Sequence, residues 1–561
     1  MRIKQAWWIL AILVAGALLR LWGIGFGLPF QFHQDEPIVV NHALAYGTGD
    51  LNPHFFIIPP LASYILFIFY AFYFVILKLF ACIPSAEAFA ISFFQDPTPF
   101  YLIARIVLGF IPGIINIYLT YRLAAKIFSL RCSLYCSLLS AVTLLNVLNA
   151  HYAYTDTLLV MWIQLVFLQI FSFVDKPSMR ASLLAGLFMG AAVATKYNAA
   201  LLVIPLVVAC VWARISLGSR IKNILVCACF AALAFVACNP FAILDMKFFL
   251  MSVTGRIGHG VIGFNHHIAY SLFEGVSSIV TILGIAGLVL ALIRKPKYLV
   301  PVLSFIVCFY LHLTFASQPY PRYALAIVPF LCLGMGFLLF EYLYPRFAHT
   351  QGKVLLIVAA FAAIIPTLSK SVVADSLLAQ QDSRISAVQW IEKNIPPESV
   401  IALDSTFFGP PLRQTTLQLH EKEKIFGKQA ELAALKSKKL QLQLKAAQPR
   451  AAYNVYYLIE GGESSGQFLG FWPVLRNTMA QLREQKIEYV IFNNMLSPAS
   501  TRALRDEVAK TATLIAVFDP YWDKHFRRSF DTVEFTCLPI ETEELFSRRT
   551  SGPYLEIYKL P

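Results

Sequence analysis

Acidic side chains are rare in the first two thirds of this 561-residue chain, because residues 1–369 contain only ten Asp and Glu. Asp35 and Glu36 are adjacent in a stretch that is otherwise aromatic, and Asp156 closely follows two tyrosines. A carboxylate can act as a general base that takes a proton from a hydroxyl group. An acidic residue beside apolar segments is costly in free energy, so these three residues are candidates for catalysis.

Helix capping is the alternative explanation for these acids. Pro37 fits the first position of a helix that runs to about Tyr46, and an acidic residue just before it would cap that helix. Glu36 is better placed for this than Asp35, and a cap would also explain Asp156 by itself. From spacing alone, capping is the more frequent outcome, so a functional interpretation needs a second observation.

Cations and imidazoles on the same predicted side of the membrane supply that observation. They are Arg105, Lys196, Arg322, His259, His266 and His267. Acids and cations gathered on one side indicate a polar site near the outer ends of the helices. Snorkelling to the interface is an alternative for Lys196 and Arg322, and a solvated loop is the more frequent role for two adjacent histidines.

Composition defines the elements that must position these residues. The chain is 58% hydrophobic and only 14% charged, whereas an ordinary soluble domain is about 25% charged. This excludes a cytosolic enzyme and predicts a polytopic α-helical membrane protein. About eleven apolar runs can cross a bilayer core of ~30 Å: 6–26, 101–121, 132–150, 156–174, 181–195, 198–213, 223–239, 270–293, 298–315, 324–344 and 354–369.

The distribution of basic residues predicts the orientation. With the N-terminus in the cytoplasm, fifteen Lys and Arg fall on the cytoplasmic side and six on the opposite side. The apolar segment 61–80 must then not cross, and Pro59-Pro60 before it and Lys78 near its end indicate an interfacial or re-entrant helix. The basic residues are scattered between apolar runs, which argues against a nucleic-acid surface.

The sequence changes character after about residue 370, where mixed charge replaces the apolar runs. We predict a membrane module at residues 1–369, with interfacial helices in its outer loop at 27–100, and a soluble extracytoplasmic α/β domain at 370–561. Short β-rich runs lie at 399–403, 453–458, 489–492, 513–518 and 554–558, and helical patterns lie at 384–394 and in the Lys-rich stretch 422–445.

A series of motifs resembles one known family. The motifs are Arg20-Leu21-Trp22, Asp35-Glu36, Gly49-Asp50, Pro53-His54-Phe55, Pro59-Pro60-Leu61, Arg105, Tyr154-Thr155-Asp156, Ala194-Thr195-Lys196-Tyr197 and Pro321-Arg322-Tyr323. Together they resemble the protein O-mannosyltransferases and the lipid A aminoarabinose transferases, which are integral membrane glycosyltransferases of the GT-C class. The resemblance covers most of residues 1–345, whereas the C-terminal domain resembles that of bacterial members only in outline.

The resemblance implies an inverting transfer of a sugar from a polyprenyl- or dolichyl-phosphate-linked donor to an acceptor hydroxyl at the outer face of the membrane. The acceptor would be a protein Ser or Thr, lipid A or another glycan. The roles are then as follows: Asp35, Glu36 and Asp156 are catalytic, with Asp35 as the base; Arg105, Lys196 and Arg322 bind the lipid phosphate; and His54 and His259 contact the sugar or acceptor. Because cationic side chains can stabilise a monophosphate leaving group, we expect no obligatory metal or other cofactor.

One departure from the family concerns the donor. The aminoarabinose transferases carry a Lys just before Pro-Pro, where this chain has Ile57-Ile58. Arg105, Lys196 or Arg322 must then supply the phosphate contact. The C-terminal domain has balanced charges without a catalytic spacing, so we expect it to shape acceptor access rather than perform chemistry.

The expected partners are the lipid-linked donor, membrane lipids and the acceptor, without nucleic acid. The predicted outer segments contain no Asn-x-Ser/Thr sequence, which favours a bacterial inner membrane. A multi-span transporter of a lipid or small polar solute is the alternative. Transporters typically place intramembrane charges at mid-span and have related halves, and this sequence shows neither.

Overall fold

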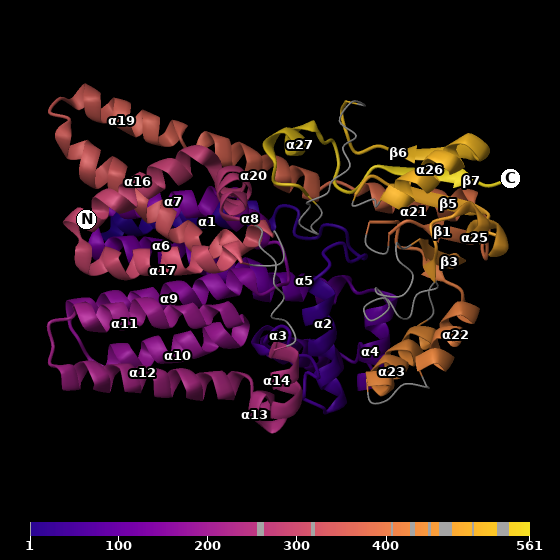
Figure 1. Ribbon diagram of the computed structural model, residues 1–561, viewed down its shortest axis with the longest axis horizontal. Coiled ribbons are helices and arrows are strands. Elements are labelled where there is room, and N and C mark those ends of the chain that lie inside the picture. Colours follow the sequence, from indigo (N-terminus) through magenta and orange to yellow (C-terminus); the bar gives the residue numbers. More distant parts are fainter. Residues whose placement is uncertain are drawn as a thin grey trace.

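A computed structural model describes residues 2–254, 263–315, 320–405, 408–426, 432–446, 450–458, 474–495, 499–523 and 538–561. Long helices form a bundle in one half of the molecule, and a β-sheet with its helices forms the other half (Figure 1). Shorter helices lie between the two halves, among them α2 (Glu36–Ala45) and α4 (Ala86–Gln95). The N-terminus lies at the end of the bundle that is far from the sheet.

The helices of the bundle coincide with the apolar runs of the sequence. They are α1 (Arg2–Leu21), α5 (Thr98–Arg105), η2 (Ile106–Phe110), α6 (Ile111–Ile127), α7 (Leu130–Val142), α8 (Leu144–Asn149), α9 (Asp156–Asp175), α10 (Met179–Thr195), η3 (Tyr197–Leu202), α11 (Val203–Trp212), α12 (Leu217–Cys238), η4 (His267–Ser277), α16 (Ser278–Arg294), α17 (Pro296–Thr314), η5 (Pro321–Ile327), α18 (Val328–Gly336), η6 (Phe337–Leu343), α19 (Thr350–Ala362) and α20 (Ile365–Leu378). Each predicted run overlaps one or more of these helices.

Inside a membrane, the hydrophobic effect does not drive helices together. Helices that pack closely there therefore need small residues at their contacts. The contact between α16 and α18 shows this. A Cβ added to Gly287 would lie 1.8 Å from the carbonyl oxygen of Gly334, and one added to Gly284 would lie 2.8 Å from that of Leu331. Larger side chains at these positions would therefore force the two backbones apart.

Eight helices within the described residues are long and apolar enough to cross a membrane, and four shorter helices are also apolar. The eight are Leu61–Leu79, Thr98–Ile127, Asp156–Asp175, Leu217–Cys238, Phe264–Arg294, Pro296–Thr314, Pro321–Arg346 and Thr350–Asn394. The predicted fold class, a polytopic α-helical membrane protein with a C-terminal α/β domain, is confirmed. The number of about eleven crossings stays a prediction.

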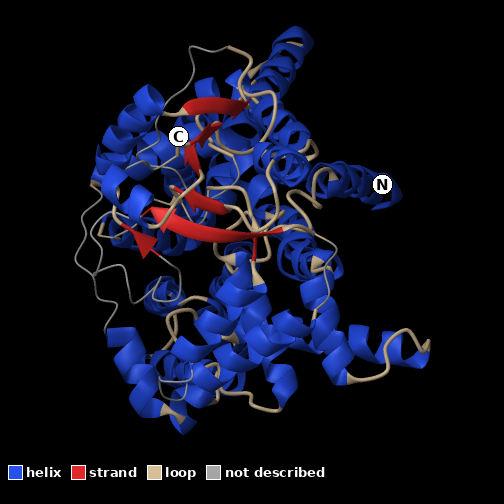
Figure 2. Ribbon diagram, turned by 90° about the vertical axis from the view of Figure 1, so that its right-hand side faces the viewer, coloured by secondary structure: helices blue, strands red, loops and turns tan. Residues whose placement is uncertain are grey.

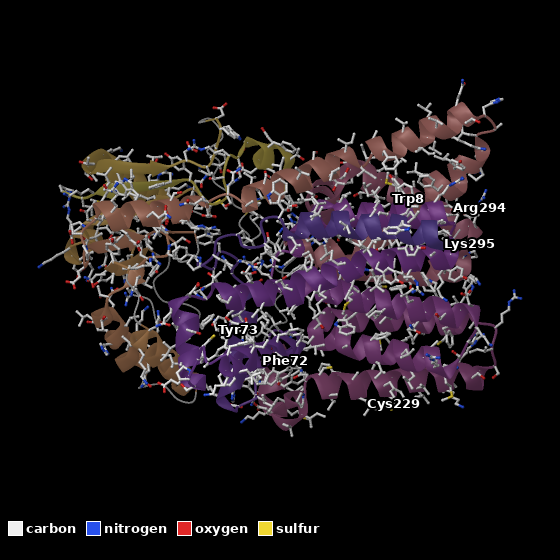
Figure 3. All side chains as sticks on the ribbon, turned by 180° about the vertical axis from the view of Figure 1, so that it is seen from behind. Trp8, Phe72, Tyr73, Cys229, Arg294 and Lys295 are labelled. Carbon is white, nitrogen blue, oxygen red and sulfur yellow. The ribbon has the colours of Figure 1, made fainter. Side chains whose placement is uncertain are left out.

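Helix α3 (Leu61–Leu79) is the segment predicted not to cross. It is a continuous helix whose apolar side chains are largely uncovered, with Phe72 65% and Leu79 77% exposed. Phe72 and Tyr73 lie at the level between the bundle and the sheet, far from Arg294 and Lys295 at the opposite end of the bundle (Figure 3). This position is the one expected of an interfacial helix. That α3 does not cross the membrane stays a prediction.

The C-terminal half contains a seven-stranded mixed sheet, whose strands lie among helices (Figure 2). The strand order is β2 (Arg413–Gln414), β3 (Ala452–Leu458), β1 (Val400–Leu403), β5 (Tyr489–Asn493), β7 (Leu555–Lys559) and β6 (Thr513–Phe518), and β4 (Val474–Leu475) pairs with β3. Strand β1 is parallel to β3 and β5, whereas β7 is antiparallel to β5 and β6. All five predicted strands are present, and only the two-residue strands β2 and β4 were not predicted.

Helices cover this sheet and connect it to the bundle. They are α21 (Ser383–Asn394), α22 (Thr416–Phe426), α23 (Leu432–Lys445), α25 (Met479–Glu484), α26 (Ala499–Thr511) and α27 (Thr542–Ser547). The helical pattern at 384–394 is confirmed as α21. The Lys-rich stretch 422–445 contains parts of two helices, and residues 427–431 between them lie outside the described part. The predicted domain boundary at residue 370 falls inside α20 and stays a prediction.

Basic side chains collect at the bundle end opposite the sheet. Lys297 Nζ lies 2.7 Å and Lys126 Nζ 3.6 Å from the carboxylate of Asp175, which joins the ends of α6, α9 and α17. Arg294 and Lys295 lie at the same end of the bundle (Figure 3). By the positive-inside rule, we expect this to be the cytoplasmic end.

We therefore expect residues 370–561 to lie outside the cytoplasm. Reporter fusions after residue 378 should give an extracytoplasmic signal, whereas fusions after Arg214 or Lys295 should give a cytoplasmic signal. A fusion after Phe80 tests α3 separately, because a cytoplasmic signal there would show that α3 crosses. A cytoplasmic signal after residue 378 would contradict the orientation.

Candidate active site

Four charged side chains predicted from the sequence form one continuous network, in the order Asp35, Arg322, Asp156 and Lys196. Arg322 Nη2 donates a hydrogen bond to Asp35 Oδ2 at 2.6 Å. Arg322 Nε lies 3.6 Å from Asp156 Oδ2. Lys196 Nζ donates a hydrogen bond to the other oxygen of Asp156, Oδ1, at 2.6 Å. Two carboxylates and two cations therefore alternate, and their formal charges cancel.

Each member of this network lies at the end of a helix. Asp35 immediately precedes α2, and Asp156 is the first residue of α9. Lys196 directly follows α10, and Arg322 is the second residue of η5. An acidic residue in the first turn of a helix interacts favourably with the helix dipole, as Asp156 does in α9. Segments far apart in the sequence thus deliver their charged groups to one place.

The two ends of the network are accessible and its middle is buried. The Asp35 side chain is 25% exposed and that of Lys196 is 20% exposed. In contrast, the Arg322 side chain is 3% exposed and that of Asp156 is 6% exposed. A substrate can therefore reach a carboxylate at one end and an ammonium group at the other.

Tyrosine rings lie around the two cations. Arg322 Cζ is 4.3 Å from the centroid of the Tyr320 ring and 5.3 Å from that of Tyr154. Lys196 Nζ is 4.5 Å from the centroid of the Tyr323 ring. These cation–π contacts stabilise the two positive charges at positions that little water can reach. The sequence analysis missed Tyr320, although aromatic residues on both sides of Pro321-Arg322 are visible in the sequence.

Helix capping, the alternative explanation for these acids, is not what the structure shows. The Asp35 side chain makes no capping hydrogen bond to α2, and the Asp35 backbone is helical, with φ −90° and ψ −19°. Asp156 lies inside the first turn of α9, after Thr155 at the N-cap position. The expectation that Glu36 caps a helix is also wrong, because its carboxylate binds other groups.

Glu36 and Arg105 form a separate ion pair, and both side chains are fully buried. Arg105 Nε and Nη2 donate to the two oxygens of Glu36, each at 2.9 Å. Arg105 Nη1 donates to the carbonyl oxygens of Ile24 and Phe26, and the Ala153 N–H donates to Glu36 Oε1 at 2.9 Å. These contacts occupy both side chains within the protein, and the predicted roles of Arg105 in phosphate binding and of Glu36 in catalysis stay predictions.

His33 is a buried member of the site that the sequence analysis missed. Its Nδ1 accepts a hydrogen bond from the Asp35 N–H at 3.3 Å, and its ring lies 4.4 Å from the ring of Tyr152. Burial, together with the charges of Arg322 and Arg105, lowers the pKa of His33 well below its ordinary value of 6.5. A neutral imidazole therefore supports the backbone of Asp35. The only signal in the sequence is its position two residues before Asp35.

His54 and His267, two of the predicted histidines, contact groups outside the network. His54 Nε2 lies 2.8 Å from Asp50 Oδ2 on the outer loop, and its predicted contact with sugar or acceptor stays a prediction. His259 lies outside the described residues. His267 is buried, with Nδ1 2.8 Å from the Ser271 hydroxyl. In the part of the chain that the structure describes, no group of three or more His, Cys, Asp and Glu is placed to hold a metal ion.

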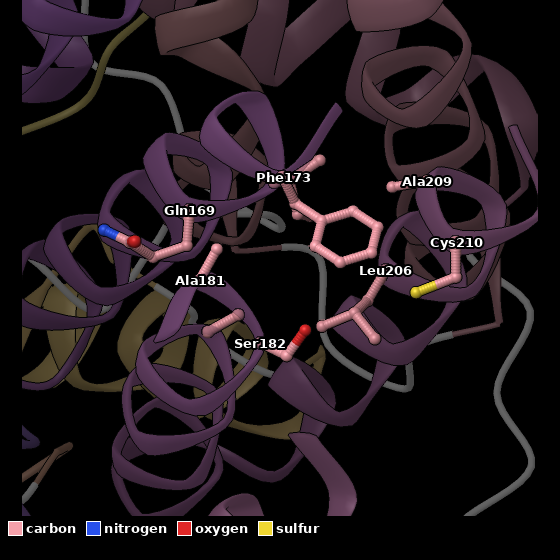
Figure 4. A pocket seen from close by; sticks show the side chains of 9 residues that line it. Gln169, Phe173, Ala181, Ser182, Leu206, Ala209 and Cys210 are labelled. Carbon is pink, nitrogen blue, oxygen red and sulfur yellow. The ribbon is translucent and has the colours of Figure 1, made fainter. Parts of the chain in front are cut away.

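Two cavities lie apart from the network. One is a small pocket between α9, α10 and α11, lined mainly by apolar groups such as Phe173, Leu206 and Ala209 (Figure 4). The other is a small pocket between α2 and the segment 53–63, lined by side chains that include His42 and Phe55. The second cavity borders the helix that begins beside Asp35.

Comparison with protein-family models gives a match. Residues 84–243 match the family described as dolichyl-phosphate-mannose-protein mannosyltransferase. The resemblance to the membrane glycosyltransferases is confirmed. The segment that matches this glycosyltransferase family contains Arg105, Asp156 and Lys196, whereas Asp35 and Arg322 lie outside it. No curated protein sequence matches the chain.

Comparison with solved structures gives matches at low sequence identity. ArnT from Cupriavidus metallidurans bound to undecaprenyl phosphate is 14% identical, with a TM-score of 0.46 over 90% of this chain and 96% of that one. The Archaeoglobus fulgidus oligosaccharyltransferase is 13% identical, with a TM-score of 0.46 over 87% and 69% of the two chains. The S. cerevisiae protein O-mannosyltransferase Pmt1-Pmt2 complex is 18% identical, with a TM-score of 0.30 over 49% and 37%.

The buried ion pair should dominate the stability of the outer loop. Replacing Glu36 with Gln leaves the Arg105 charge buried without its counter-ion, and breaking a buried pair costs about 3–5 kcal/mol. We expect a clear fall in the thermal unfolding temperature in detergent. Asp50→Asn is the matched control, because Asp50 and His54 form an ion pair that is about half exposed and such pairs contribute little. Equal losses in the two variants would contradict the assignment.

Proposed function

We propose that this protein is an inverting glycosyltransferase that moves a sugar from a polyprenyl-phosphate-linked donor to an acceptor hydroxyl at the outer face of the membrane. The observation that carries the proposal is the network of Asp35, Arg322, Asp156 and Lys196, with an accessible carboxylate at one end and an accessible ammonium group at the other. The acceptor is a protein Ser or Thr, lipid A or another glycan. The matched family is named for a sugar linked to a lipid phosphate, which is the proposed class of donor.

Asp35 is the base in this proposal, because its carboxylate is partly exposed whereas that of Glu36 is fully buried. The acceptor hydroxyl donates its proton to Asp35, and its oxygen attacks the anomeric carbon. The bond between that carbon and the phosphate oxygen breaks on the opposite side. The phosphate leaves with the electron pair, and the configuration at the anomeric carbon is inverted.

Lys196 and Arg322 stabilise the charge that develops on the leaving phosphate. The Lys196 ammonium group carries three N–H donors, and one of them is directed to Asp156. The remaining donors can bind phosphate oxygens, and such charge-assisted hydrogen bonds are about twice as strong as neutral ones. Asp156 contacts both cations and so holds them at a fixed spacing. It is a positioning residue in this proposal.

The proposed position of the network, near the outer ends of the helices, supports an enzyme rather than a transporter. All four charged groups lie at the ends of helices, whereas a transporter typically binds its substrate near the midplane of the bilayer. The family match gives the transporter alternative no support. The proposed location is a bacterial inner membrane, with the N-terminus in the cytoplasm and the C-terminal domain outside it.

Asp35→Asn tests the role of the base. The amide preserves the shape of the side chain but cannot accept the proton, so turnover should fall about 10²–10⁴-fold while donor binding changes little. The measurement uses purified enzyme with a defined polyprenyl-phosphate-linked sugar. Asp96→Asn is the control, because Asp96 is exposed on the outer loop, accepts a hydrogen bond from the nearby Thr98 N–H and should retain turnover. Near-normal turnover of Asp35→Asn would overturn the proposed function.

Lys196→Ala tests the phosphate site. The variant removes the accessible cation, so the affinity for a polyprenyl monophosphate should fall about tenfold to a hundredfold, which corresponds to about 1.4–2.8 kcal/mol. Lys247→Ala is the control, because Lys247 lies on α14 (Met246–Thr254), is exposed and is predicted to lie on the same side of the membrane. Equal affinities in wild type and Lys196→Ala would return Lys196 to the snorkelling interpretation.

A further inference from the structure

We propose that the C-terminal domain positions Asp35 through an arginine clamp, defined by Arg384 and Arg450 of that domain and by Phe30 and Phe32 of the first outer loop. This inference rests on the proposed function, because it assigns the clamp to the loop that carries the base. It adds a positioning role to the expectation that the C-terminal domain shapes acceptor access rather than performs chemistry.

The clamp consists of two cation–π contacts on neighbouring rings. Arg384 Cζ lies 3.6 Å from the centroid of the Phe32 ring, and Arg450 Cζ lies 4.8 Å from that of Phe30. The two rings are themselves stacked, with centroids 6.1 Å apart. Arg384 is 2% exposed and Phe32 is 7% exposed, so this contact lies where water does not weaken it.

Both arginines are oriented by their own domain before they meet the loop. Arg384 Nε and Nη2 donate to the two carboxylate oxygens of Asp382, each at 2.8 Å. Asp382 also accepts a hydrogen bond from the Arg384 N–H, which caps α21. Arg450 Nε donates to Glu392 at 2.7 Å. Bidentate pairing fixes the plane of a guanidinium group, so α21 presents Arg384 to the ring in a defined orientation.

The loop side of the clamp is equally constrained. Phe32 belongs to an apolar cluster that also contains Phe26, Tyr152 and Leu378. Gly27 has a φ of +70°, and a Cβ at this position would lie 2.5 Å from the Phe32 ring. The ring therefore packs directly on the backbone of the loop, and few alternative positions are open to it.

A short path joins Phe32 to the base. His33 follows Phe32 and accepts the hydrogen bond from the Asp35 N–H. The Asp35 carboxylate in turn lies 2.6 Å from Arg322. A shift of the Phe32 ring would therefore move Asp35 relative to Arg322. Displacements of about 1 Å at a reacting group can reduce turnover by about a hundredfold.

Other contacts hold the domain against the bundle without touching Phe30 or Phe32. Lys370 Nζ donates to the Glu274 carboxylate at 2.8 Å and to the Thr542 hydroxyl at 3.0 Å. Lys445 Nζ lies 2.6 Å from the Glu87 carboxylate on α4. The clamp can therefore be removed while the domain stays docked, which separates a positioning role from a purely structural one.

The test compares Phe32→Leu, Phe32→Tyr and Arg384→Met in the full-length protein. Leu keeps the apolar burial but removes the ring face, so kcat should fall about tenfold to a hundredfold with the KM for the donor nearly unchanged. Phe32→Tyr keeps the ring and should retain kcat close to that of wild type. Arg384→Met should resemble Phe32→Leu, and the double variant should lose no more than either single variant. Lys445→Gln is the control, because it removes a docking contact away from the loop.

The outcomes separate the clamp from the proposed function. If Asp35→Asn loses turnover while both Phe32→Leu and Arg384→Met keep wild-type kcat, the clamp is overturned and the proposed function stands. Equal losses in Phe32→Tyr and Phe32→Leu would also overturn the clamp, because the ring would then not matter. If Phe32→Leu or Arg384→Met fails to fold, Arg450→Met decides by its kcat, since its partner Glu392 is partly exposed and does not become a buried unpaired charge.

Discussion

Arg322 is the residue on which the arrangement of the site depends. Its guanidinium group lies between the carboxylates of Asp35 and Asp156, where little water is present to separate like charges. Without this cation, two negative groups at the ends of α2 and α9 would repel each other. Arg322 lies just before α18, at the start of the tenth predicted membrane run. Its ion pair with Asp35 therefore connects this run to the first outer loop. One ion pair thus joins Arg322 and Asp35, which are 287 residues apart in the sequence.

Two ion pairs with different surroundings follow from the adjacent acids Asp35 and Glu36. Glu36 is fully buried and shares Arg105 with carbonyl groups of the loop, so its pair holds the loop in place. Asp35 is partly exposed, so its carboxylate can meet a substrate. Neighbouring residues at the start of one helix point in different directions, which allows one to be structural and the other to be reactive. The buried pair thus fixes the backbone from which the accessible pair extends.

The C-terminal domain is joined to the membrane half by contacts of three kinds. The first kind is apolar packing, which includes Phe32 and Leu378. The second is hydrogen bonding, as between Lys370 and Thr542. The third is the arginine clamp, in which Arg384 contacts the Phe32 ring of the first outer loop. The domain that contains the sheet therefore contacts the loop from which Asp35 extends. The proposed effect of this domain on turnover would act through these contacts, without the domain touching the substrate.

Local sequence patterns determined the elements of this protein. Apolar runs and β-branched or aromatic runs predicted the bundle helices and strands β1, β3, β5, β6 and β7, because hydrophobic periodicity is a property of a short segment. The rarity of charge beside apolar runs also identified Asp35, Asp156, Lys196 and Arg322. Only the tertiary structure decided which charges pair, that Arg105 is occupied by Glu36, that His33 lies behind Asp35, and that Arg384 contacts Phe32. These pairings join residues that are far apart in the chain. The side chains become buried, and so need partners, only when the helices and the sheet have packed together.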